Sequence, residues 1–164
     1  MPGLNDNPFA VLTAVVAPAI LTNACSVLAL GTANRVARVV DRTRVVIAGL
    51  GSLAAESADY AARTRELERL KLRGRLLLTA LRSFYAALGA FAASALGAVV
   101  GAVLASYDIP IAFHFAAAVA FGAGAIGVTA LVSGCVGMVR ENRLAIQSIA
   151  EEVELARTHR HDGL

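Results

Sequence analysis

Three long stretches of the sequence contain no Asp, Glu, Lys or Arg, and they constrain the fold more than any other feature. They have 28, 25 and 31 residues and run over Asn7–Asn34, Ser83–Tyr107 and Ile109–Val139. A helix needs about 20 apolar residues to cross the hydrocarbon core of a bilayer. Hydrophobic residues make up 57% of the chain, and only 16% are charged. The sequence therefore excludes a soluble globular domain and predicts an all-α membrane protein with three transmembrane helices, at about residues 9–30, 83–106 and 111–139.

Basic residues are distributed very unevenly around these spans. All 15 Lys and Arg residues lie within residues 35–82 or 140–160, whereas Met1–Pro8 and Ser106–Pro110 have none. Because basic segments are retained in the cytoplasm during insertion, we expect the N-terminus outside and the C-terminus in the cytoplasm. The basic excess then indicates contact with anionic lipid headgroups at the cytoplasmic face, and not with nucleic acid.

The segments on the basic side have helical patterns of their own. A largely polar stripe continues from the first span into residues 31–75 at steps of three or four, which places its members on one helix face: Asn23, Ser26, Leu30, Asn34, Arg38 and Asp41. Val45–Ala55 is uncharged but has only 11 residues, so we interpret it as an interfacial segment or a loop. Residues 140–157 fit either a coiled coil or an amphipathic helix docked on 31–75. We therefore predict a single membrane domain, 1–164, with helical cytoplasmic extensions at 31–75 and 140–157.

Small residues recur every four positions along the second span and form what we call the small-residue ridge: Gly89, Ala93, Gly97, Gly101 and Ala105. Such a ridge lets another helix approach closely, so that van der Waals contact replaces the hydrophobic effect that lipid cannot supply. We predict a helix-packing surface here. Its partner is either the third helix of the same chain or a second copy of the protein.

The first span carries a polar cluster in its apolar sequence, formed by Thr22, Asn23 and Ser26 after Pro18, with Asn34 farther along. Proline within a helix predicts a kink. The amide of Asn23 is costly to expose to lipid, so we expect it to face another helix or a wet cavity. The cluster is interpreted either as an interhelical polar contact or as the lining of a pore.

His114 lies about one turn inside the outer boundary of the third span, where an ionisable group is a candidate for a proton-linked role. The sequence contains no P-loop, dinucleotide-binding glycine motif, zinc-protease motif or serine-hydrolase motif. We therefore expect no catalytic, cofactor-binding or metal site, and a protein that is not an enzyme.

Two stretches resemble a known family. The first is "PAILTNACSVLALGTANRVARVVDRTR" (Pro18–Arg44), and the second is "MVRENRLAIQSIAEEVELA" (Met138–Ala156). Together they resemble an uncharacterised bacterial family of small three-span inner-membrane proteins that carry a domain of unknown function. The resemblance implies three helices and a multi-pass protein of the bacterial inner (plasma) membrane. It implies no activity, ligand or catalytic residue.

These features favour a non-enzymatic, self-associating membrane protein that acts as a scaffold or accessory subunit, with itself or another membrane protein as partner. The small-residue ridge and the absence of charge within the spans support this hypothesis. The alternative is a homo-oligomeric channel or transporter lined by the polar face of the first span. Three helices of one chain enclose too little space for a pore, so this alternative needs several copies.

Overall fold

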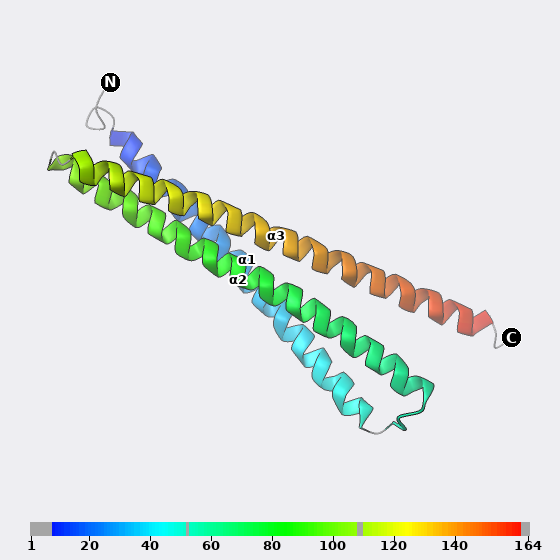
Figure 1. The fold of residues 1–164 in the computed structure, drawn as a ribbon. Coiled ribbons are helices and arrows are strands. Elements are labelled where there is room, and N and C mark those ends of the chain that lie inside the picture. Colours follow the sequence, from blue (N-terminus) through cyan, green and yellow to red (C-terminus); the bar gives the residue numbers. More distant parts are fainter. Residues whose placement is uncertain (1–7, 52, 108–109, 162–164) are drawn as a thin grey trace. The chain divides into compact units, whose positions relative to one another are not determined.

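The chain folds into three long helices joined by short connections (Figure 1). The computed structural model describes residues 8–51, 53–107 and 110–161, with side chains placed for 15–51, 53–107 and 110–146. Helix α1 spans Pro8–Leu50, α2 spans Ala58–Ser106 and α3 spans Pro110–His161. Within these residues there is no β-strand. The predicted all-α fold is confirmed for these residues, and each of the three helices is long and apolar enough to span a membrane.

Every helix is also much longer than a bilayer requires. The three helices have 43, 49 and 52 residues. At about 1.5 Å per residue the shortest extends roughly 65 Å, against a hydrocarbon core of about 30 Å. Each helix therefore continues well beyond its uncharged stretch. In particular, α1 includes the first part of Val45–Ala55 and ends only at Leu50.

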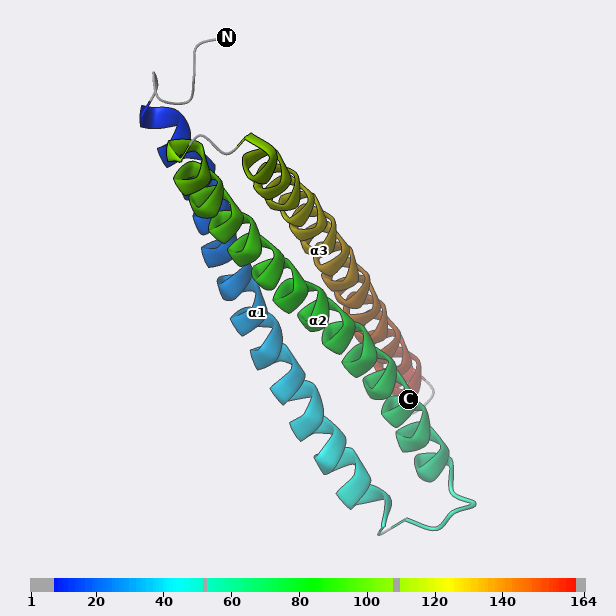
Figure 2. The same ribbon diagram turned by 60° about the vertical axis from the view of Figure 1, so that its left-hand side comes forward.

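A short capped turn connects α1 to α2 (Figure 2). The Leu53 N–H donates to the Leu50 carbonyl at 3.2 Å, which closes a turn directly after α1. Ser57 then caps α2, because its hydroxyl oxygen accepts the Tyr60 N–H at 3.1 Å. Serine is favoured at this position since it satisfies a backbone donor that has no partner inside the helix.

Contacts divide the chain into two compact units, each with its own core. The first unit contains residues up to 31 and residues 81–134, and the second contains 32–80 and residues from 135 onward. Each helix contributes to both units, and the two are described separately below.

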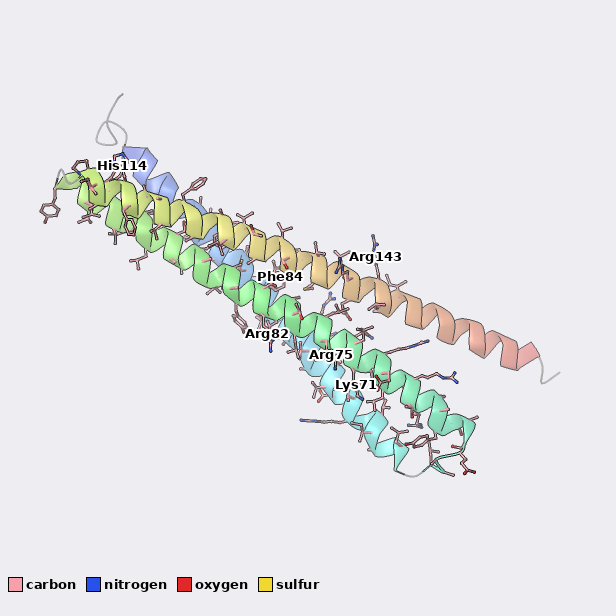
Figure 3. All side chains as sticks on the ribbon, viewed as in Figure 1. Lys71, Arg75, Arg82, Phe84, His114 and Arg143 are labelled. Carbon is pink, nitrogen blue, oxygen red and sulfur yellow. The ribbon has the colours of Figure 1, made fainter. Side chains whose placement is uncertain are left out.

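The core of the first unit is built from two phenylalanines of α2 that pack against two glycines of α3. Phe84 (Figure 3) and Phe91 are 0% and 1% exposed. A Cβ atom at Gly134 would lie 2.6 Å from the Phe84 ring, and one at Gly127 would lie 2.7 Å from the Phe91 ring. The two phenylalanines are seven residues apart, and so are the two glycines, so the two contacts repeat along the helices. In each contact the ring fills the space left by the missing side chain of a glycine. Cys25 of α1 joins the Phe91 cluster.

Toward the start of α3, small residues bring α2 and α3 still closer. A Cβ at Gly97 would lie 2.9 Å from Ala120 Cβ, and one at Gly101 would lie 3.8 Å from Ala116 Cβ. The Ser94 hydroxyl donates to the Ala120 carbonyl oxygen at 2.8 Å. This side-chain hydrogen bond crosses between two helices at a place where their backbones are nearly in contact.

The second unit has an aliphatic core between α1 and α2, consisting of Val39, Val46, Leu70 and Leu77. Helix α3 joins this unit through Gly137, where a Cβ would lie 3.3 Å from Ala80 Cβ. The Thr32 hydroxyl of α1, fully buried, lies 2.9 Å from the Met138 sulfur of α3. All three helices therefore contribute to this unit.

Buried positions repeat every seven residues along each helix. On α1 they are Cys25, Thr32, Val39 and Val46; on α2 one such series is Leu70, Leu77, Phe84 and Phe91. A seven-residue repeat is typical of helices that pack side by side over many turns, because it keeps one stripe of residues facing the neighbouring helix.

Candidate functional sites

The small-residue ridge of α2 divides into two parts. Gly97 and Gly101 pack against α3 of the same chain. Gly89 has no atom within 4 Å of the position that a Cβ would take, and Ala93 is exposed. Ala105 is half-buried. One half of the ridge thus packs within the chain, while the other half leaves a shallow, small-residue surface on the first unit.

The polar cluster of α1 lies largely on the surface. The Thr22 hydroxyl donates to the Pro18 carbonyl oxygen at 2.8 Å, and the Ser26 hydroxyl donates to the Thr22 carbonyl oxygen at 3.0 Å. Their hydroxyl protons are therefore satisfied within their own helix. Asn23 and Asn34 are exposed. Asn23 lies deep in the uncharged stretch. Its amide hydrogens have no hydrogen-bond partner among the side chains that the structure describes.

His114 is exposed in the first turns of α3 (Figure 3). Its Nδ1–H donates to the Pro110 carbonyl oxygen of the same helix at 2.6 Å. The neighbouring Phe113 ring meets the imidazole edge-on, with ring centres 5.5 Å apart. A local carbonyl thus fixes the ring, and the proton-linked role stays a prediction.

A buried ion cluster in the second unit was not identified from the sequence. The Glu141 side chain of α3 is only 3% exposed. Arg73 of α2 donates to its Oε1 through Nε at 2.9 Å, and Nη2 of the same side chain forms an ion pair with this oxygen at 2.8 Å. Arg35 of α1 approaches Oε2 at 3.5 Å and donates to Asn142 Oδ1 at 2.6 Å. The Glu141 carboxylate therefore links α3 to both α1 and α2.

The sequence does contain a signal for this cluster. Glu141 lies seven residues after Gly134 and fourteen after Gly127, so it continues the stripe of buried residues along α3. A carboxylate on such a stripe requires cationic partners, because an unpaired buried charge is very costly. The positions of Arg35 and Arg73 follow only from how the helices pair.

Helix α3 continues through the C-terminal segment to His161. Val139 and Ile146, which share a heptad position, are both exposed. The next residue of that series, Val153, lies outside the residues with described side chains, so a coiled coil there stays a prediction. Cys25 is buried and Cys135 is exposed, and no disulfide joins these two cysteines. Among the side chains that are placed, no three His, Cys, Asp or Glu residues gather as a metal site.

Three helices that are each long and apolar enough to cross a membrane place this protein in the class of multi-pass membrane proteins. More narrowly, the chain belongs to the family described as protein of unknown function (DUF2721), whose model matches residues 15–151. The resemblance to an uncharacterised family is thereby confirmed. Comparison with curated proteins gives no match, and comparison with solved structures gives none either.

Proposed function

We propose that this protein is a self-associating membrane protein that acts as a scaffold or accessory subunit and is not an enzyme. The observation that carries the proposal is the exposed amide of Asn23, which lies deep in an uncharged stretch of α1. An amide surrounded by lipid loses the hydrogen bonds that it makes with water, so it is driven toward a polar partner on another helix.

A second copy of the same chain is the simplest partner for this amide. A carboxamide has both donor and acceptor atoms, so two Asn23 side chains related by a two-fold axis can each donate to the other. The same face of α1 also presents Ser26, whose hydroxyl oxygen retains capacity to accept. Gly89 and Ala93 add a surface on α2 where another helix can approach closely.

The orientation that we propose places the N-terminus outside and the C-terminus in the cytoplasm of a bacterial inner membrane. It rests on the basic residues, all of which lie at or beyond the same end of the three uncharged stretches. The ion cluster of the second unit then lies on the cytoplasmic side. A cysteine-labelling assay on intact cells, with a cysteine placed in Met1–Pro8 or in the last residues, reports each terminus directly.

Self-association is tested by the mass of the purified full-length protein in nanodiscs or mild detergent. We expect a dimer or a larger oligomer, and we expect Asn23→Leu to raise its dissociation constant about fivefold, equivalent to about 1 kcal/mol. Thr129→Ala is the matched control, because the exposed Thr129 hydroxyl of α3 donates to the Ala125 carbonyl oxygen of its own helix at 2.9 Å and lies outside the proposed contact face. A wild-type protein that is monomeric at every concentration and in every detergent contradicts the proposal.

A homo-oligomeric channel remains the alternative function, and one observation favours it. The polar stripe of α1 is exposed along its whole length, from Asn23 through Ser26 and Asn34 to Arg38 and Asp41. Copies that turn this stripe toward one another would line a polar path. Ion flux in proteoliposomes that Asn23→Leu abolishes would favour the channel over the scaffold.

A further inference from the structure

We infer that the second unit contains a binding pocket for a phosphate group, built by arginines around the buried Glu141 carboxylate. The pocket has a volume of about 350 Å³ and lies between the three helices of that unit. Its polar lining consists of Arg35, Arg38, Arg42, Arg73, Glu141 and Asn142, and its remaining lining is apolar. This site is independent of the proposed self-association, because one chain supplies every residue.

The charge of the lining determines the kind of ligand. Four arginines face a single carboxylate, so the pocket carries a formal charge of +3. The charge of Arg42 is compensated by Glu66, which does not line the pocket and whose Oε1 lies 2.6 Å from Arg42 Nη2. Arg38 lines the pocket and has no ion-pair partner among the described side chains. An excess of positive charge persists after every described ion pair is counted, and it favours an anion.

Glu141 holds two of these arginines in place. Arg73 uses Nε and Nη2 to contact one carboxylate oxygen, so its Nη1 donors remain available. Arg35 uses Nη1, which leaves the donors of Nη2 and Nε. Because their side chains are 29% and 40% exposed, both retain donors that a ligand can reach. A carboxylate that orients guanidinium groups reduces the entropy lost when they bind a ligand.

Guanidinium groups match phosphate better than they match a simple halide ion. The planar fork of an arginine pairs two N–H donors with two phosphate oxygens, and several arginines neutralise the charge of the anion. A volume of about 350 Å³ lies within the range of pockets that hold small ligands. The pocket therefore fits one phosphate group together with part of the molecule that carries it.

The location of the pocket brings two sources of phosphate within reach. Arg35 is the first charged residue after the uncharged stretch of α1, and Glu141 is the second after that of α3. The pocket thus lies where the apolar part of the chain ends, at the depth of phospholipid headgroups. It also opens to water, so a soluble phosphate compound has access to the same donors.

The test compares Arg38→Gln with Arg143→Gln in the full-length protein. Both changes remove one positive charge, but Arg143 is exposed and does not line the pocket (Figure 3). In one arm, native mass spectrometry measures binding of phosphatidylglycerol against phosphatidylcholine. In the other arm, equilibrium dialysis in phospholipid-free detergent measures binding of inorganic phosphate.

We expect Arg38→Gln to weaken binding about tenfold or more in at least one arm, and Arg143→Gln to change it less than about twofold. Loss in the phosphatidylglycerol arm alone identifies a lipid headgroup as the source, and loss in the inorganic phosphate arm identifies a soluble one. Equal losses in the two variants, or no binding in either arm, overturn the proposal. Because the Arg38 side chain is exposed and unpaired, we expect Arg38→Gln to fold, and circular dichroism checks this.

Discussion

Substituting Gly134 by alanine tests the close packing of α2 on α3 in the first unit. The added methyl group would lie 2.6–3.0 Å from three atoms of the Phe84 ring. Phe84 is 0% exposed, so the ring is enclosed by neighbouring atoms and cannot turn into solvent without disturbing them. Overpacking of this kind costs about 1–3 kcal/mol. Replacing a helical glycine by alanine also stabilises the helix, by about 1 kcal/mol.

A matched variant separates these two effects. Gly122 is on the same helix and in the same unit, but nothing lies within 4 Å of the position that its Cβ would take. Gly122→Ala therefore gains the helix propensity without the clash, and we expect it to be stabilised by up to about 1 kcal/mol. We expect Gly134→Ala to be less stable than Gly122→Ala by about 2 kcal/mol, since propensity cancels between them.

The assay is unfolding of the purified protein in mixed micelles by titration with dodecyl sulfate, followed by circular dichroism. Adding Phe84→Leu to Gly134→Ala replaces the rigid ring by a smaller side chain, and the two changes together should cost less than the sum of their separate effects. If Gly134→Ala unfolds at the same midpoint as Gly122→Ala, Phe84 does not pack on Gly134 and the reasoning is refuted.

The same unfolding assay checks two further contacts. Glu141→Ala leaves two arginines without their carboxylate and should destabilise the protein by about 3 kcal/mol, whereas Glu68→Ala, which removes an exposed ion pair with a lysine on its own helix, should cost less than about 1 kcal/mol. Ser94→Ala should cost about 1 kcal/mol because it removes the hydrogen bond to Ala120, and Ser106→Ala, whose hydroxyl bonds its own helix, should cost nearly nothing. Equal effects within either pair would contradict the corresponding contact.

The three-helix fold could be predicted from the sequence because it depends on hydrophobicity summed over long stretches. About 20 uncharged residues in a row are rare outside a membrane, and this chain has three such runs. The length of the helices was harder to define. Charged residues such as those of 58–75 mark the end of a span but not the end of a helix, and α2 in fact runs unbroken from Ala58 to Ser106.

Which faces meet could not be predicted, because alanine and glycine are common on every face of these helices. The small-residue ridge follows a four-residue spacing, whereas the buried stripe of α2 follows steps of three and four that add up to seven. The two patterns therefore coincide near Gly97 and Gly101 and diverge by Gly89. Burial of Phe84 and Phe91 depends on glycines of another helix, Gly134 and Gly127, which lie 50 and 36 residues farther along the chain and which no local pattern of α2 reveals.

The same seven-residue repeat accounts for the ion cluster. On α2, Arg73 lies seven residues before Ala80, which is buried, and on α3, Glu141 lies seven residues after Gly134. The buried stripe of each helix continues beyond its uncharged stretch. Where the sequence becomes polar, charged residues therefore occupy buried positions. In lipid, glycines and phenylalanines can occupy such positions; in the polar segment, opposite charges on facing stripes are needed to offset the loss of water. The pocket has more arginines than carboxylates, and this imbalance leaves Arg38 available to bind an anion.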